Sequence, residues 1–189
     1  MASPKPAKPS SSRLVTINRA PVLTLWAAVV AERMGFDRDE SLTLGKVMAG
    51  LNARRKGVGL GLYTPASTEK TKASAAEKKS AGTVFVELLG FAVPATKTAE
   101  GLRGSSRGRV EKPESVRRYL ESKFGDSLAD ARRAMERLAA SLDPDALSLR
   151  AYELYETFRP EIPRGTRGWG AKGVLDLDLV RGLASGRKR

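Results

Sequence analysis

The amino-acid sequence predicts an α+β fold that is mainly α. Much of the chain between residues 21 and 159 places apolar side chains three and four positions apart, which is the spacing of a buried helix face. Shorter segments at 14–18, 58–63 and 83–94 favour extended backbone, and turn residues separate the segments. With 189 residues, 41% of them hydrophobic, the chain is long enough to bury a core.

The first predicted helix covers residues 21–34. Pro21 opens it at a position where the missing N–H costs nothing, and Gly35 ends it. Apolar side chains occupy both sides of this helix, so we expect it at the centre of the core. They are Val22, Leu23, Leu25, Trp26, Ala27, Val29, Val30 and Met34.

A second helix is predicted over 37–56, where Asp37 and Glu40 fit a capping box. Gly45 and Gly50 each cost about 1 kcal/mol inside a helix. They indicate close packing on the first helix or, alternatively, close approach to a nucleic-acid backbone. The cations that end the helix complement its dipole or form a phosphate-contacting cluster. They are Arg54, Arg55 and Lys56.

The predicted β-structure is a hairpin that pairs residues 58–63 with 83–94. The segment 58–63 is weakened by glycines, and Gly90 marks a bulge or turn between extended segments at 83–89 and 91–94. The long loop, 64–82, has few bulky apolar residues and is expected to be mobile. The helix pair and this hairpin form one unit, 14–95. A disordered basic tail, 1–13, precedes it.

The C-terminal half is predicted to be helical. A basic Gly/Ser loop at 96–112 leads into a helical unit at 113–185. That unit contains three helices, at 113–124, 126–142 and 143–159; Pro113 opens the first, and Asp126 and Asp143 cap the other two. A short helix at 176–184 is capped by Asp176. Residues 186–189 form a basic tail.

The chain carries a formal charge of +13 that is unevenly distributed. Residues 111–160 hold nine basic and ten acidic side chains, so the excess lies in the other segments, which we expect to be mainly tails and loops. Such a field attracts polyanions.

Several classes of protein are excluded by composition. The chain has no cysteine and no histidine, which rules out disulfides, zinc sites and Ser-His or Cys-His nucleophile pairs. The acidic residues at 37–40 are explained by helix capping, and Asp176 and Asp178 do not form a facing acid/base pair. Either set could bind Mg²⁺ weakly but nothing requires it, so we expect no metal, no cofactor and no enzymatic activity. No apolar run approaches the ~20 residues that span a bilayer, so we expect no membrane association and a cytoplasmic protein.

Two helices joined by a short turn, the second ending in Arg54-Arg55-Lys56, are followed by two β-like stretches. Over residues 14–95 this order resembles a winged-helix or helix-turn-helix protein. The resemblance implies that the second helix enters the major groove of DNA and that the hairpin contacts the backbone. The groove-facing residues would be Thr43, Lys46, Gly50, Ala53 and Arg54. This face is poor in Asn, Gln and Arg, which read bases, so backbone contacts are expected instead.

Residues 168–173 match the letters of a dinucleotide fingerprint, but no strand precedes them and no long helix begins there. The segment is instead predicted to be a loop in which Arg167 and Lys172 flank Trp169. Trp169 either stacks on a base or anchors the tail to the helical core.

The sequence therefore predicts a non-enzymatic DNA-binding protein, regulatory or nucleoid-associated, that contacts mainly the phosphate backbone. RNA or ribosome binding is the closest alternative, since glycine-spaced arginines suit both nucleic acids. An adaptor that binds a protein partner through its C-terminal helices, or a homo-oligomer, is the alternative from another class. The candidate nucleic-acid-binding residues are Lys46, Arg54, Arg55, Lys56, Arg103, Arg107, Arg109, Arg167, Trp169 and Lys172.

Overall fold

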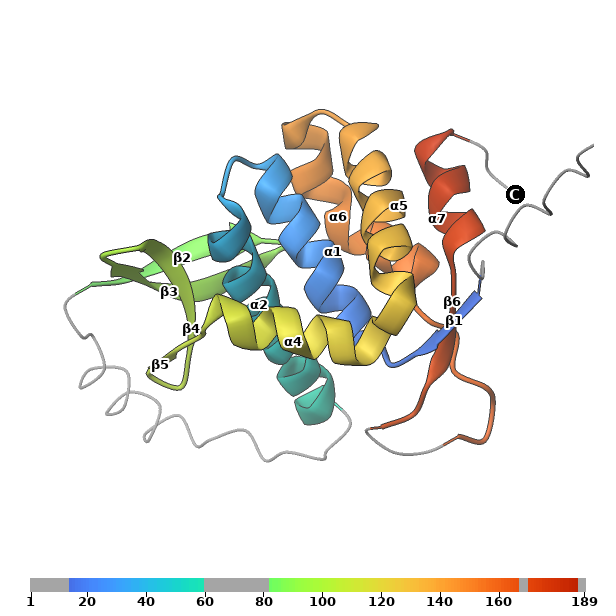
Figure 1. The fold of residues 1–189 in the computed structure, drawn as a ribbon, viewed down its shortest axis with the longest axis horizontal. Coiled ribbons are helices and arrows are strands. Elements are labelled where there is room, and N and C mark those ends of the chain that lie inside the picture. Colours follow the sequence, from blue (N-terminus) through green and yellow to red (C-terminus); the bar gives the residue numbers. More distant parts are fainter. Residues whose placement is uncertain (1–13, 60–81, 167–169, 187–189) are drawn as a thin grey trace, which may run out of the picture.

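The structure is a computed structural model, and it describes residues 14–59, 82–166 and 170–186. Its fold class is α+β and mainly helical, as the sequence predicts (Figure 1). The predicted tail at 1–13, nearly all of the loop at 64–82 and the last residues of the C-terminal tail lie outside the described residues. The helices are α1 (Arg19–Arg33), α2 (Arg38–Gly59), α4 (Pro113–Phe124), α5 (Leu128–Ala140), α6 (Pro144–Phe158) and α7 (Leu177–Ala184). The strands are β1 (Leu14–Ile17), β2 (Thr83–Leu88), β3 (Phe91–Thr98), β4 (Gly101–Ser106), β5 (Arg109–Val110) and β6 (Gly173–Asp176).

Helix α1 is the central element, as its two apolar sides predict. Eleven consecutive residues, 21–31, are buried. Helices α2, α4, α5 and α6 all contact α1, which runs through the middle of the molecule (Figure 1). Residues from both halves of the sequence therefore contribute to one buried apolar cluster.

Trp26 connects α1 to α6 and is completely buried. Its indole Nε1–H donates a hydrogen bond to the carbonyl oxygen of Ala151 at 2.8 Å. Its ring meets Phe158 edge to face, with the ring centroids 5.4 Å apart. A buried indole needs a partner for its N–H, so this bond positions α6 as well as satisfying Trp26.

Helix α2 begins with the predicted capping box. The Asp37 carboxylate accepts from the Glu40 amide at 2.8 Å, and the Glu40 carboxylate accepts from the Asp37 amide at 3.2 Å. The second oxygen of Glu40 accepts from the Leu102 amide at 2.8 Å. One side chain thus closes the start of α2 and holds β4 beside it.

The main sheet has the antiparallel order β2-β3-β4-β5, and it corrects two predictions. Residues 96–112 are not simply a loop, because they include the end of β3 and all of β4 and β5. Their small residues are required where β4 crosses α2: a Cβ on Gly104 would lie 2.4 Å from the Thr43 carbonyl oxygen. The glycines and serines that suggest a loop in the sequence instead allow β4 to pack closely on α2.

The predicted pairing of 58–63 with 83–94 is also wrong. Val58 and Gly59 are the last residues of α2, whereas 60–63 lie outside the described residues. The hairpin is formed by β2 and β3, whose register places Leu88 opposite Phe91. Leu89 and Gly90 connect them with φ values of 53° and 75°, which suits a tight two-residue hairpin turn.

The two ends of the described chain meet in a second, smaller sheet. The predicted extended segment at 14–18 is confirmed as β1, and it pairs antiparallel with β6, which the sequence does not predict as a strand. Helix α7 follows, and its N-cap is confirmed because Asp176 accepts from the amides of Asp178 and Leu179.

The C-terminal helices agree with prediction except at one cap. Asp143 caps α6 as predicted, accepting from the Ala146 amide at 2.9 Å. Asp126 does not cap α5, because residues 125–127 form a 3₁₀ turn before the helix begins at Leu128.

A matched pair of glycines in α2 tests how α1 and α2 pack. A Cβ on Gly45 would lie 2.6 Å from the Thr24 carbonyl oxygen and 2.9 Å from the Ala28 amide nitrogen, whereas nothing lies within 4 Å of one on Gly50. Gly45→Ala should therefore destabilise the protein by about 1–3 kcal/mol. Gly50→Ala should stabilise it by up to about 1 kcal/mol. Chemical denaturation measures both changes, and equal effects would contradict this packing.

Candidate nucleic-acid interface

The three cations at the end of α2 are exposed but differ in their contacts. The Lys56 ammonium lies 3.2 Å from the Glu156 carboxylate, and the Arg55 guanidinium lies over the Phe91 ring at 5.3 Å from its centroid. Arg54 has no ion pair within the described residues. Arg54 is thus the member of the cluster with the fewest competing contacts.

Arg103 is not a surface residue, which corrects its prediction as a phosphate contact. Its side chain is only 6% exposed. Its guanidinium donates to the carbonyl oxygens of Leu102 at 3.0 Å and Glu100 at 3.1 Å. The glycine-rich sequence around it suggests a loop, whereas strand β4 places Arg103 against the protein.

Arg107 and Arg109 lie at the tip of the β4–β5 hairpin and are exposed. Arg107 and Gly108 form the turn with φ values of 52° and 76°, and Ser106 pairs with Arg109 in the register. Neither arginine has an ion pair within the described part of the chain. This tip fits the prediction of available cations.

The face of α2 that the winged-helix resemblance assigns to the DNA groove is partly covered. Thr43 is completely buried, and its hydroxyl accepts from the Gly104 amide of β4 at 3.0 Å. The Lys46 ammonium lies 3.6 Å from the centroid of the Tyr119 ring of α4. Burial lowers the pKa of Lys46, an effect that Glu111 opposes. Strand β4 and helix α4 thus cover the part of this face around Thr43 and Lys46, whereas Gly50 and Arg54 remain exposed.

The remaining candidates lie near β6. Lys172 is exposed just before that strand. Arg167 and Trp169 lie outside the described residues, so their predicted roles are not addressed by the structure.

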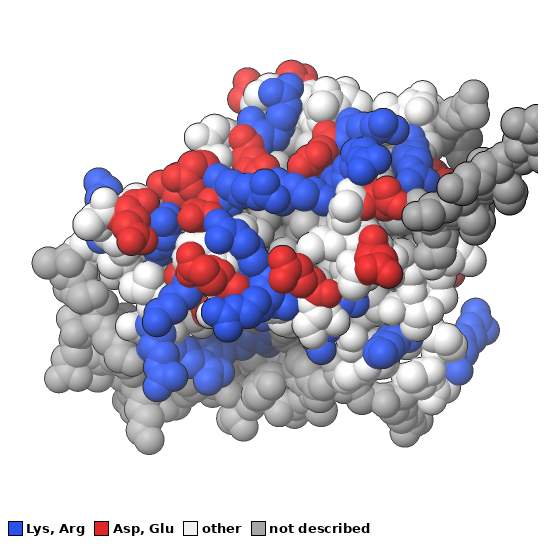
Figure 2. Space-filling model, viewed as in Figure 1, with Lys and Arg blue, Asp and Glu red and all other residues white. Residues whose placement is uncertain are grey.

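We define the basic edge as Arg54, Arg107, Arg109, Lys112 and Lys172, five exposed cations that have no ion pair among the described residues. Other exposed cations without such a pair, among them Arg38, Lys97, Arg118 and Arg137, belong to other segments. The β4–β5 tip and the end of α2 both lie along the lower edge of the molecule in Figure 1. Blue atoms gather at the lower left of Figure 2, over this tip, while red and blue atoms interleave over much of the rest of that face.

Arginines on the C-terminal helices are mostly paired instead. Arg132 pairs with Glu32 at 2.6 Å and with Glu136 at 2.7 Å, and Arg159 pairs with Glu156 at 2.8 Å. Longer pairs involve Arg133 and Arg150. The predicted near-neutrality of this part of the chain therefore corresponds to actual ion pairs.

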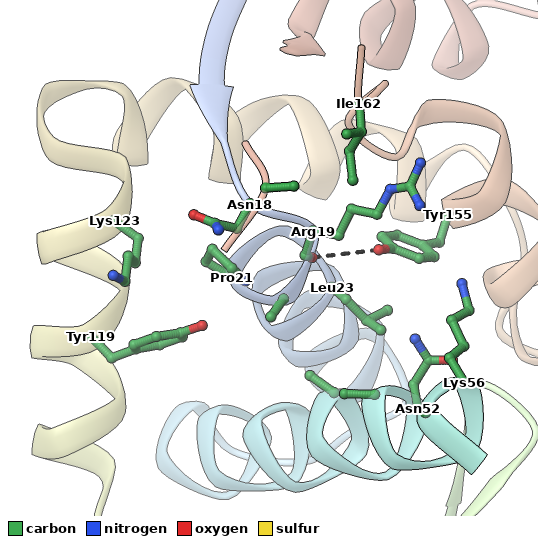
Figure 3. A pocket seen from close by; sticks show the side chains of 15 residues that line it. Asn18, Arg19, Pro21, Leu23, Asn52, Lys56, Tyr119, Lys123, Tyr155 and Ile162 are labelled. Atoms are coloured by element: carbon green, nitrogen blue, oxygen red, sulfur yellow. Dashed lines mark hydrogen bonds between the residues drawn. The ribbon is translucent and has the colours of Figure 1, made fainter. Parts of the chain in front are cut away.

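A pocket of about 600 Å³ opens between the start of α1, the C-terminal half of α2 and α4. Figure 3 shows Tyr119 and Lys123 of α4 on one side, Asn52 and Lys56 of α2 on another, and Arg19 near Tyr155 on a third. No Asp or Glu lines it. Burial raises the pKa of Tyr119 and Tyr155 above the ordinary tyrosine value, which already keeps the hydroxyl protonated at neutral pH. The Tyr155 hydroxyl donates to the Arg19 carbonyl oxygen at 3.4 Å.

Sequence reasoning did not identify this pocket. Tyr119 and Lys123 are four residues apart on one helix face, which was the available signal for α4. No local pattern distinguishes Asn52, because its role depends on the approach of α4 and α6 to α2.

Neither a metal site nor a known relative identifies the chain. No group of three or more Asp or Glu residues in the described ranges could hold a metal ion. No helix in those ranges is long and apolar enough to cross a membrane. Comparisons with protein-family models, curated proteins and solved structures find no match to this chain.

The structural role of Arg103 can be separated from surface charge. Arg103→Ala should cost about 1–3 kcal/mol, because it removes hydrogen bonds from a buried group. Arg109→Ala removes the same charge from an exposed position and should change stability by less than about 0.5 kcal/mol. Denaturant unfolding compares the two, and an Arg103→Ala protein as stable as the parent would show that the buried guanidinium contributes nothing.

Proposed function

We propose that this protein binds nucleic acid, DNA ahead of RNA, by placing phosphates along the basic edge. The observation that carries the proposal is the β4–β5 tip, where Arg107 and Arg109 are both exposed and have no ion pair within the described residues. Cations of the basic edge lack ion partners among the described residues, whereas most arginines of the C-terminal helices have them. Arg107 and Arg109 lie two residues apart at one hairpin tip and repel each other, so their placement together gives the fold no benefit.

Contact with phosphates gives these residues a physical role. An exposed cation can replace a condensed counterion on the nucleic-acid backbone, and the release of that counterion drives binding. A cation already held in an ion pair must first lose its partner. The cations of the basic edge are therefore suited to this exchange.

Backbone contact also agrees with the surroundings of α2. Thr43 and Lys46, which would face a major groove in a winged-helix arrangement, contact β4 and α4. Base readout by this helix has little support, and we propose binding with weak sequence preference, in a bacterial-type cytoplasm or nucleoid and without catalysis.

The two alternatives are weighed by the same observations. RNA or ribosome binding would use the same cations, so only experiment distinguishes it from DNA binding. The apolar stripes of α4, α5 and α6 are buried in the core, including Leu120, Met135 and Leu154. Leu149 of α6 is 87% exposed, but it is a single apolar side chain on otherwise polar outer faces, so an adaptor is the weaker proposal.

Binding to duplex DNA should depend steeply on salt. Five phosphate contacts imply that log K falls with log salt concentration with a slope of about −4.5. Fluorescence anisotropy with a labelled random-sequence duplex, titrated between low and moderate salt, measures this slope. Matched duplex RNA tests the preference for DNA, and binding insensitive to salt would exclude the proposal.

The hairpin tip offers a test with a matched control. Arg107→Ser/Arg109→Ser should weaken DNA binding and reduce the magnitude of the salt slope by about two, one for each lost phosphate contact. Arg133→Ser/Arg150→Ser removes the same net charge from ion-paired positions and should change the slope much less. If the two double variants behave alike, binding reflects total charge, and the basic edge has no special role.

A further inference from the structure

We propose that the pocket between α1, α2 and α4 binds a small organic phosphate of nucleotide size. This site is distinct from the basic edge, and the inference does not depend on nucleic-acid binding there. It rests on the composition of the pocket walls, on one buried amide and on the volume.

The walls combine cations with apolar surface. Arg19, Lys56 and Lys123 line the pocket, and no carboxylate does. Lys123 has no ion pair within the described residues, whereas the Lys56 ammonium forms an ion pair with the Glu156 carboxylate. The Arg19 Nε also donates to the Pro160 carbonyl oxygen at 3.0 Å, so Lys123 is the least engaged of the three cations. A lining with cations and no carboxylate favours a doubly charged phosphate over a singly charged carboxylate.

Asn52 supplies the most specific observation. Asn52 is only 6% exposed, and its side-chain oxygen Oδ1 accepts a hydrogen bond from the Tyr152 hydroxyl at 2.9 Å. Its amide nitrogen, in contrast, has no hydrogen-bond partner within the described part of the chain. No fully buried side-chain nitrogen or oxygen there lacks a partner, so this nitrogen keeps some exposed surface, and Asn52 lines the pocket. Figure 3 shows it turned toward the pocket interior.

The other polar groups also suit an acceptor ligand. The Tyr119 hydroxyl points into the pocket in Figure 3 and remains a donor at neutral pH. The first turn of α1 carries no acidic residue, and Asn18 does not cap it with its side chain. Donors and positive charge thus converge on one space that lacks carboxylates.

Volume and apolar surface indicate more than a bare phosphate. About 600 Å³ lies within the range of pockets that hold small organic molecules. Pro21, Leu23, Ala49, Ala53 and Ile162 provide apolar wall. A ligand that fills this space needs an apolar or planar body beside its phosphate, and a nucleotide has both. A free nucleotide and the 5′-phosphorylated end of a strand offer the same chemistry.

Isothermal titration calorimetry with the full chain tests the proposal. The four nucleoside 5′-monophosphates are the probes, beside the matching nucleosides and inorganic phosphate. We expect at least one monophosphate to bind at least tenfold more tightly than its nucleoside and than inorganic phosphate. A 5′-phosphorylated dinucleotide that binds more tightly than the monophosphates would assign the site to strand ends, and the reverse order would assign it to free nucleotides. Failure of every phosphorylated probe to bind at millimolar concentration would overturn the proposal.

Three variants locate the binding. Asn52→Asp keeps an acceptor for the Tyr152 hydroxyl but replaces the donor with a negative charge, so affinity should fall at least tenfold. Lys123→Gln, at an exposed position that tolerates change, should reduce affinity severalfold. Arg118→Gln, exposed on the same helix outside the pocket, should leave affinity unchanged. Parental affinity in both pocket variants would overturn the assignment.

The Arg107→Ser/Arg109→Ser protein separates the two proposals. It should bind the monophosphate as the parent does, even if its affinity for DNA is lost. A monophosphate affinity that falls in parallel with the affinity for DNA would place the ligand on the basic edge and overturn the pocket assignment.

Discussion

The structure depends on the burial of α1 on every side. An amphipathic helix can bury its apolar face against one neighbouring element, but a helix that is apolar on all sides must be covered on all sides. Residues 21–31 form an unbroken buried run, and four other helices cover it. The indole N–H of Trp26 also helps to position α6, because a buried N–H needs an acceptor and this one donates to the Ala151 carbonyl oxygen. The N-terminal helix thereby organises the C-terminal ones.

Close approach of backbones extends this arrangement to the sheet. Gly45 brings α2 against α1, and Gly104 brings β4 against the other side of α2. Glu40 reinforces the second contact by accepting from the Leu102 amide. Helix α2 is therefore held between α1 and β4, and its middle turns are no longer available to an outside partner. Its exposed C-terminal turns carry the cations.

Packing also sorts the charged residues into three groups with different chemistry. Arginines such as Arg132 are neutralised by neighbouring carboxylates. Arg103 is buried and bonded to carbonyl oxygens. The basic edge is left exposed and unpaired within the described residues, which suits an extended polyanion. Beside it, the pocket combines cations with apolar walls and the free amide of Asn52, which suits a small ligand instead.

The sequence by itself determined the helices, the caps at Asp37, Asp143 and Asp176, and the central position of α1, because periodicity and capping are local properties. Only the tertiary structure decided that 96–112 contains β-strands. The small residues there are required because β4 packs closely against the backbone of α2, which is distant in the sequence. The same holds for the site. Composition predicts an excess of cations, but exposure and pairing, which distinguish Arg109 from Arg103, depend on which strand lies against which helix. The pocket is equally non-local, because its walls come from segments up to about 150 residues apart and no single segment contains its pattern.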